Sequence, residues 1–213
     1  MSASLLQLRL ADGTIKPLHA ERWYSEPSPG EMQLLHGIAG PVLDVGCGPG
    51  RLVVGLGRLG VMALGIDPAP GAVRACRERG APVLQRSVFQ RLPAEGRWGT
   101  VLLADGNVGI GGDPVRLIAR CRDLAGPEGH VLVELASAGT GLRQHRARLE
   151  CGHDVGPWFD WAEVGVDAIA EVAGAAGLAP FNCQPLPGEG RWFATLGAAQ
   201  SAAQAAGAAD AVA

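Results

Sequence analysis

A glycine-rich stretch at residues 46–50 constrains the fold more strongly than any other part of the sequence. Apolar residues at 42, 43 and 45 surround the carboxylate Asp44, and glycines at 46, 48 and 50 then alternate with Cys47 and Pro49. An apolar run that suits a helix begins at Leu52. Glycine lets the backbone turn sharply and approach a ligand closely, and a helix N-terminus offers free N–H groups. The order strand, glycine loop, helix predicts a nucleotide-binding α/β unit.

A second apolar strand, predicted at 61–66, ends at Asp67. A carboxylate about 20 residues after the glycines, at the end of the second strand, suits hydrogen bonds to two ribose hydroxyls. Asp67 can equally cap the helix predicted at 70–79, and both roles can hold at once. The position indicates an adenosine ligand without choosing between methyl-donor and NAD cofactors.

The rest of the chain repeats this alternation of strands and helices. Further strands are predicted at 82–85, 98–104 and 129–135, with helices at 51–59, from Asp113 onward and at 166–177. Such alternation predicts a doubly wound α/β fold with a mostly parallel sheet, whose ligands bind at the carboxyl ends of the strands. That edge would carry the glycine loop, Asp67, Ser87 and Asp105.

Asp105 is followed by an unusual stretch with four glycines among residues 106–112. We expect the glycines to allow close approach of the backbone to a ligand. Glu134 interrupts the apolar strand at 129–135, so it either faces the site or forms a structural salt bridge.

The two regions outside this pattern are candidates for covering the site. Residues 1–40 are expected to form an N-terminal cap with a hairpin at 5–16 and a helix at 31–38, with Arg22, Trp23 and Tyr24 as covering residues. Residues 137–163 are expected to form an inserted hairpin over the strand ends. The aromatic residues Trp158, Phe159 and Trp161 either line a hydrophobic substrate site or pack at an edge. The Ala-rich residues 198–213 are expected to be a frayed helix or disordered.

Composition excludes several classes of protein. The 213 residues are 47% hydrophobic and 18% charged, with a net charge of −3 and Lys16 as the only lysine, so a nucleic-acid partner is disfavoured. The five cysteines show no metal-binding spacing, and no metal is expected. No signal peptide or membrane span is apparent, which indicates a reduced cytoplasmic compartment.

The pattern Asp-x-Gly-x-Gly-x-Gly at 44–50 resembles motif I of the class I S-adenosylmethionine-dependent methyltransferases. The dinucleotide fingerprint would instead require glycine at position 51, which is Arg. The resemblance covers about 41–197 and implies a seven-stranded Rossmann-like sheet with a C-terminal antiparallel hairpin at 178–186 and 191–197. It also implies S-adenosyl-L-methionine as cofactor. The cofactor-binding residues would be Asp44, Gly46, Cys47, Gly48, Gly50, Asp67, Pro68, Ser87, Val88 and Asp105.

The family often places a carboxylate for the adenine amino group where this chain has Ser87, so a hydroxyl and the Val88 N–H would serve there. The expected reaction is methyl transfer to a small-molecule acceptor, with Asp105, Asn107 and His145 as catalytic residues and His153 and Glu134 as further candidates for a base. The chain lacks the Pro-Pro and Pro-Cys motifs of relatives that methylate DNA or protein glutamine.

Two alternatives remain open from the sequence. The first is a non-catalytic cofactor-binding protein on the same fold. The second is an NAD(P)-dependent oxidoreductase, which is disfavoured because the single tyrosine and single lysine form no Tyr-x-x-x-Lys pair. The acceptor and the choice between monomer and homodimer stay open.

Overall fold

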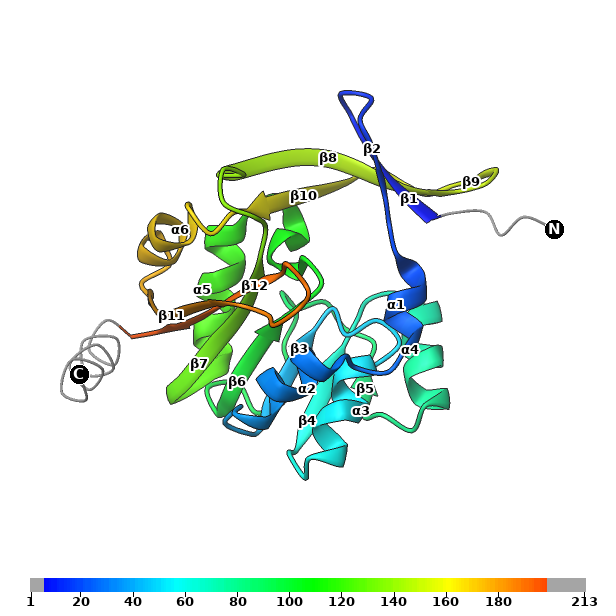
Figure 1. Ribbon diagram of the computed structural model, residues 1–213. Helices are drawn as coiled ribbons and strands as arrows, with labels where there is room; N and C mark the ends of the chain where they lie inside the picture. The colour runs from blue at the N-terminus through cyan, green and yellow to red at the C-terminus, as the bar shows by residue number, and fades with distance from the viewer. Residues whose placement is uncertain (1–5, 199–213) are drawn as a thin grey trace.

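The apolar strands form one seven-stranded sheet in the computed structural model, which describes residues 6–198 (Figure 1). Its strand order is β11-β12-β7-β6-β3-β4-β5, and β12 runs antiparallel to both neighbours while the pairs from β7 to β5 are parallel. The predicted fold class and the C-terminal antiparallel hairpin are therefore confirmed. The strands are β3 (Val42–Val45), β4 (Ala63–Ile66), β5 (Val83–Leu84), β6 (Trp98–Leu103), β7 (Ala125–Leu135), β11 (Ala179–Pro185) and β12 (Trp192–Gly197).

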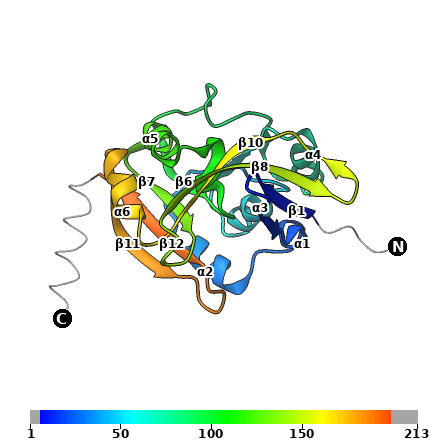
Figure 2. The ribbon, with the colours of Figure 1, turned by 90° about the horizontal axis from the view of Figure 1, so that it is seen from above.

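Helices cover both faces of this sheet, as Figure 2 shows from above. Both faces need a cover because consecutive apolar side chains of a strand such as β6 point to opposite faces of the sheet, and both sets must be buried. Val101 and Leu103 pack in the core beneath α5 and α6, whereas Leu102 and Ala104 pack beneath α2 and α3. The helices are α2 (Pro29–His36), α3 (Arg51–Arg58), α4 (Pro70–Glu78), α5 (Pro114–Leu124) and α6 (Ile169–Ala175).

Two helices begin at side-chain caps that are readable in the sequence. The Ser28 side chain accepts a hydrogen bond from the Glu31 N–H while the Glu31 carboxylate accepts one from the Ser28 N–H, a complete capping box for α2. Asp113 accepts from the Arg116 N–H at the start of α5, as its position before Pro114 predicts. Both caps fix where the chain enters the helices that flank the strand ends.

A second sheet, which we call the lid sheet, is built from the two regions outside the main pattern. Its order is β10-β8-β1-β2, with β9 also paired to β8. It crosses above the carboxyl ends of the main sheet (Figures 1 and 2). The strands are β1 (Leu6–Leu10), β2 (Ile15–Pro17), β8 (Leu142–Cys151), β9 (Asp154–Val155) and β10 (Phe159–Val164), and β2 leads into α1 (Ala20–Tyr24).

The lid sheet joins segments that the sequence treats as separate. The hairpin at the start of the chain forms as predicted, but β1 pairs with β8 along Leu6 to Leu10, so the N-terminal cap and the inserted segment share one sheet. Periodicity predicts strands but not partners across such a sequence separation. The N-terminal cap and the inserted hairpin, expected as two separate structures, thus form a single sheet.

Gly109 and Gly112, two of the four glycines after Asp105, make room for this lid sheet. They lie in the short helix η1 (Asn107–Gly112), which packs against β10. A Cβ at Gly109 would lie 2.1 Å from the Ala162 carbonyl oxygen, and one at Gly112 would lie 2.7 Å from the Asp160 Cβ. The missing side chains at these two positions admit strand β10 of the lid, where the sequence predicts a ligand, whereas Gly106 precedes η1 and lines the space between the two sheets.

The predicted C-terminal tail and the predicted absence of a membrane span can be compared with the described residues. Of the predicted Ala-rich tail at 198–213, residues 199–213 lie outside the described residues. None of the helices within residues 6–198 is long and apolar enough to cross a bilayer.

Candidate active site

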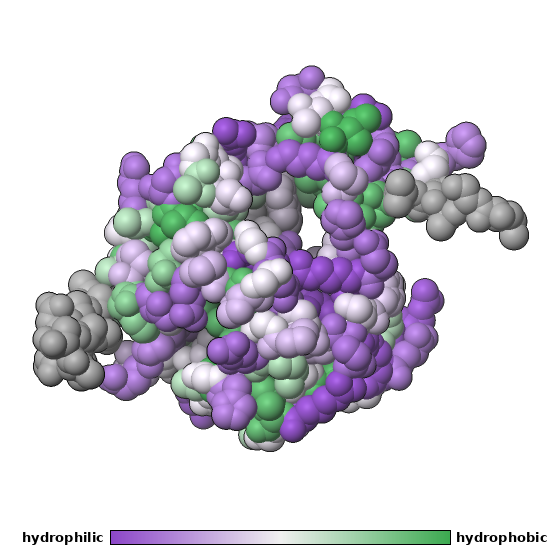
Figure 3. Space-filling view, viewed as in Figure 1, coloured by the Kyte–Doolittle hydropathy of each residue, from purple (hydrophilic) through white to green (hydrophobic). Residues whose placement is uncertain are grey.

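A cavity of about 600 Å³ separates the main sheet from the lid sheet. Its floor is the glycine loop with Asp67, Asp105 and Glu134, and its roof is the inner face of the lid. The space-filling view shows the hollow beneath the lid (Figure 3). This volume falls in the range of small-molecule binding sites. The cavity thus lies at the edge of the sheet that the strand–helix order predicts.

The three glycines of the loop have left-handed backbones but different surroundings. Their φ angles are +73° at Gly46, +54° at Gly48 and +81° at Gly50. A Cβ at Gly46 would lie 2.7 Å from Asn107 Nδ2, and one at Gly50 would lie 2.4 Å from the Cys76 Sγ. No atom lies within 4 Å of a Cβ at Gly48, which lines the cavity. Gly46 and Gly50 are therefore required for packing, while Gly48 leaves room for a ligand.

The turn after β6 holds the glycine loop at both ends. The Asn107 Nδ2 donates to the carbonyl oxygens of Val45 and Gly46 at 2.8 and 2.9 Å. At the other end of the loop, Arg51 Nη2 donates to Asp105 Oδ2 at 2.6 Å. Asp105 itself is left-handed, with a φ of 53°, a conformation that Asp tolerates better than most residues. Asn107 therefore shapes the loop, which fits a positioning role.

Asp67 fixes the loop and faces the cavity. Its Oδ2 accepts from the Gly48 N–H at 3.1 Å, and its Oδ1 accepts from the Ala69 N–H at 2.8 Å. Burial raises the pKa of Asp67, and these two backbone hydrogen bonds oppose the rise. Helix α4 begins later, at Pro70, without a side-chain cap. Each carboxylate oxygen retains a lone pair for a ligand hydroxyl.

Asp44 is the buried carboxyl on the floor, with 2% of its surface exposed. No donor among residues 6–198 hydrogen-bonds to it. Burial, followed by the nearby charge of Asp105, raises the pKa of Asp44 to about 8, although Arg51 opposes the rise. The carboxyl is therefore mostly protonated at neutral pH, and a cation that enters the cavity would favour its charged form.

Three arginines and three carboxylates interleave beneath the cavity, and we call this set the floor network. Arg191 donates to both oxygens of Glu134, at 2.7 and 2.6 Å, and to Glu31 at 2.6 Å. Arg51 donates to Glu31 and to Asp105. The members are Arg22, Arg51, Arg191, Glu31, Asp105 and Glu134.

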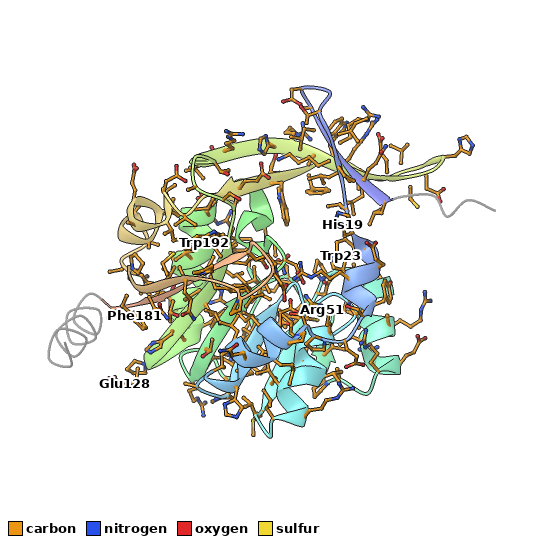
Figure 4. All side chains as sticks on the ribbon, viewed as in Figure 1. His19, Trp23, Arg51, Glu128, Phe181 and Trp192 are labelled. Carbon is orange, nitrogen blue, oxygen red and sulfur yellow. The ribbon has the colours of Figure 1, made fainter. Side chains whose placement is uncertain are left out.

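The floor network joins six segments of the chain through groups that are mostly removed from water. Glu31 is 2% exposed and Arg51 is 2% exposed. Burial opposes ionisation of Glu31, but hydrogen bonds from Arg51, the Ser28 N–H and Arg191 lower its pKa to about 2. Burial also opposes the charge of Arg191, and its bonds to Glu134 outweigh that and raise its pKa. Figure 4 labels Arg51 at the centre of the molecule.

The sequence analysis predicted Asp105 and Glu134 as site residues but did not predict Glu31, Arg51 and Arg191, which connect them in the floor network. Glu134 both lines the cavity and pairs with Arg191, so the two sequence alternatives hold at once. Glu31 could have been recognised from the Ser-x-x-Glu capping box that starts at Ser28. Arg51 could have been recognised because it occupies the position where the dinucleotide fingerprint has glycine. Arg191, in the turn before β12, carries no comparable signal.

Several predicted site residues do not line the cavity. The His145 Nε2 lies 3.1 Å from Glu163 Oε2, and Glu163 lines the cavity while His145 does not. The Val88 side chain is 3% exposed in the main core, and the Ser87 N–H and hydroxyl bond within their own loop, to Gln90 and Phe89. Pro68 and Gly50, both predicted to bind the cofactor, do not line the cavity either. The structure thus gives no support to a base role for His145 or to an adenine contact at Ser87 and Val88.

The roof and the side wall contain the expected covering residues. Trp23 and Tyr24 of α1 line the cavity, and Figure 4 shows Trp23 on α1 beside it. Phe159 and Trp161 line the roof in an edge-to-face pair with ring centroids 6.1 Å apart. Trp158 instead lies outside the cavity under the Arg148 guanidinium, 4.8 Å from its carbon. The aromatic cluster predicted near the site is therefore split between the two faces of the lid.

Comparisons with known sequences agree with the core of this arrangement. A family profile described as a methyltransferase domain matches residues 42–129. The ubiquinone biosynthesis O-methyltransferase of Methylococcus capsulatus is 33% identical over 134 residues, which are 53% of this chain and 56% of that protein. The chain thus spans about half the length of this curated relative.

Comparisons with solved structures extend to the lid. The S-adenosylmethionine-dependent methyltransferase of Bacteroides fragilis, in complex with S-adenosyl-L-homocysteine, has a TM-score of 0.78 at 19% identity over 93% of this chain and 89% of that one. The 1,6-didemethyltoxoflavin-N1-methyltransferase of Burkholderia thailandensis has a TM-score of 0.60 at 22% identity over 84% and 82%. At these identities the likeness establishes the shared fold.

Proposed function

We propose that this chain, whose residues 42–129 are a methyltransferase domain of the class I S-adenosylmethionine-dependent type, transfers a methyl group to a small-molecule acceptor. The observation that carries the proposal is the open space at Gly48, between Asp44 and Asp67 on the cavity floor. Relatives support the acceptor class, since the names of two of them refer to ubiquinone biosynthesis and to didemethyltoxoflavin.

The residues on the floor fit S-adenosyl-L-methionine. The proposal assigns Gly48 to the methionine part, Asp67 to the ribose hydroxyls and Asp44 to a cationic group of the cofactor. Asp44 accepts no hydrogen bond from residues 6–198 and Asp67 retains free lone pairs, so both offer acceptors on the cavity floor. When bound, the cofactor supplies a methyl group that is already activated for in-line displacement.

The protein's own contribution is positioning and exclusion of water. Asn107 and Arg51 fix the two ends of the glycine loop, and the lid covers the cavity with apolar side chains. Holding two reactants in line lowers the barrier by removing the need for a bimolecular encounter. Asp105 would shape the floor as a positioning residue, because its carboxylate is already held by Arg51.

The test is calorimetric titration with S-adenosylhomocysteine and NADH on the wild type and Asp67→Asn. We expect S-adenosylhomocysteine to bind and Asp67→Asn to weaken it about tenfold, which corresponds to about 1.4 kcal/mol. Asp113→Asn is the matched control, since Asp113 also accepts a backbone N–H but caps α5 away from the cavity. Binding of NADH alone would contradict the proposal.

A second measurement separates an enzyme from a non-catalytic binding protein. Purified protein is incubated with S-adenosyl-L-methionine and pooled small molecules, and S-adenosylhomocysteine formation is followed by mass spectrometry. An acceptor-dependent rise that Asp67→Asn reduces supports methyl transfer. Cofactor binding without turnover on any pool would favour the binding protein.

A further inference from the structure

We infer that the acceptor is an apolar ring compound that carries no carboxylate, phosphate or other anionic group. This inference rests on the proposed function and names its substrate class. The charges and side chains that face the cavity from the roof and from the floor support it.

The roof offers an apolar surface with aromatic rings. Leu8, Leu18 and Leu149 line the cavity beside Phe159 and Trp161. Leu149 is an exposed large hydrophobic residue, with 37% of its surface accessible, although it lies on the inner face of the lid. Aromatic and aliphatic side chains that remain accessible inside a cavity gain most from contact with a flat apolar ligand.

Lys16, the one cation among the described residues that line the roof, is already neutralised. Lys16 Nζ donates to both oxygens of Glu163, at 2.7 and 2.6 Å, and the His145 Nε2 lies against the same carboxylate. Lys16 and Glu163 both line the cavity. A ligand anion would have to displace Glu163 from Lys16, so it would gain no net charge pairing on the roof.

The floor also has no free cation among the described residues that line it. Arg51 is the cation there, and its guanidinium is bound to Glu31 and Asp105. Asp67, Asp105 and Glu134 line the floor in addition. Lys16 and Arg51 are the lining cations among the described residues, and five carboxyl groups line the same cavity, those of Asp44, Asp67, Asp105, Glu134 and Glu163. Arg22 and Arg191 pair with Asp105 and Glu134 from outside the lining, so each cation at the wall already has a carboxylate partner. An anionic acceptor would meet carboxyl groups and no free cation among the described residues, whereas an uncharged or cationic acceptor is tolerated.

The test compares two probes with the same rings, 2-naphthol and 2-naphthoate, by calorimetric titration of the protein saturated with S-adenosylhomocysteine. We expect 2-naphthol to bind at least about tenfold more tightly than 2-naphthoate. Trp161→Ala should weaken 2-naphthol, whereas Trp158→Ala, outside the cavity, should not. Equal or tighter binding of 2-naphthoate, or no binding of either probe, would overturn the inference.

A charge variant tests the cause of the selectivity. Glu163→Gln frees Lys16, so 2-naphthoate should gain at least about fivefold while 2-naphthol stays within about twofold. Glu150→Gln is the matched control, because Glu150 pairs with Arg9 and Arg148 on the outer face of the same sheet. If Glu163→Gln prefers 2-naphthol over 2-naphthoate as strongly as the wild type does, the Lys16–Glu163 pair is not the cause of the selectivity. Failure of S-adenosylhomocysteine to bind would instead count against the proposed function, so the two failures are distinguishable.

Discussion

The floor and the roof of the cavity are built on opposite physical principles. The floor network interleaves three arginines with three carboxylates, and the Arg51 side chain is 3% exposed. The roof is mainly apolar, and the Lys16–Glu163 pair is its one ion pair at the cavity wall among the described residues. Charged groups with directional bonds fix geometry, whereas apolar surfaces accept ligands of varied shape. Under the proposed function, directional ion pairs fix the shape of the cofactor side, and polarity selects what binds at the acceptor side.

The two regions also differ in how they are attached. The floor network ties α2, α3, the ends of β6 and β7 and the turn before β12 through side chains. The lid is attached through backbone contact, where β10 lies against the glycines of η1. Each attachment can be broken by one substitution, with a neighbouring residue of the same type as control.

The largest effect is expected from breaking the floor network at Arg51. Arg51→Ala leaves the carboxylates of Glu31 and Asp105 buried without one of their partners, which costs about 3–5 kcal/mol of unfolding free energy. Arg58→Ala, at the other end of the same helix, removes an exposed pair with Glu26 and should cost about 0–1 kcal/mol. Urea unfolding measures both. Similar losses in the two variants would show that the floor network adds nothing beyond a surface ion pair.

Acid should weaken the floor through Glu31. Its pKa in the folded protein is lowered to about 2 from 4.5, so its contribution is present above pH 4.5 and is lost as the pH falls towards 2. The wild type should therefore lose about 3 kcal/mol over this range that Glu31→Gln does not lose. Urea unfolding at a series of pH values checks this, with Glu78→Gln at an exposed position as control. Parallel pH profiles for wild type and Glu31→Gln would contradict the assignment.

The attachment of the lid should fail at Gly109. A Cβ there would meet the Ala162 carbonyl oxygen, so Gly109→Ala should cost about 1–3 kcal/mol. Hydrogen exchange of the β10 amides should rise at the same time, because the lid strand is displaced. Gly57→Ala on α3 is the control, since its Cβ meets no atom and alanine favours helices by about 1 kcal/mol. Unchanged exchange in β10 would mean that η1 does not hold the lid.

A second effect of pH concerns Asp44, the floor carboxyl without an arginine of its own. Its pKa in the folded protein is raised to about 8, so the folded state retains a proton that the unfolded chain releases above about pH 4. Stability should then fall with rising pH between these values, by at most about 1.4 kcal/mol per pH unit. Asp44→Asn should remove that slope. The measurement is thermal unfolding between pH 5 and 8, and an unaltered slope in the variant would refute it.

The sequence predicts the main sheet well because its rules are local. Strand β3, the glycine loop and α3 follow from apolar runs and glycines within one short stretch, and Asp67 follows from its distance to them. The same reasoning places Asp105 and Glu134 at the strand ends, where the structure has them on the cavity floor.

The parts that sequence could not predict depend on distant partners. Arg191 pairs with Glu134 and Glu31, which are far from it in the sequence, and the hydrophobic periodicity of the sequence does not predict such ion pairs. The glycines of η1 appeared to be ligand contacts because a gap left by glycine has the same sequence signature whether a ligand or a strand fills it. His145 illustrates the same limit, since its partner Glu163 is known only from the pairing of β8 with β10.

The pairing of β1 with β8 has a consequence for the order in which the chain can fold. Leu6 at the start of the chain pairs with Cys151, and Leu10 with Ala147. During synthesis the N-terminal hairpin has no strand beside it until that region has left the ribosome, whereas β3, α3 and β4 can assemble from nearby residues. The glycine loop can therefore form while the cavity is still uncovered. The lid is complete only once β10 (Phe159–Val164) has also been made, so the cavity is covered late in synthesis of the chain.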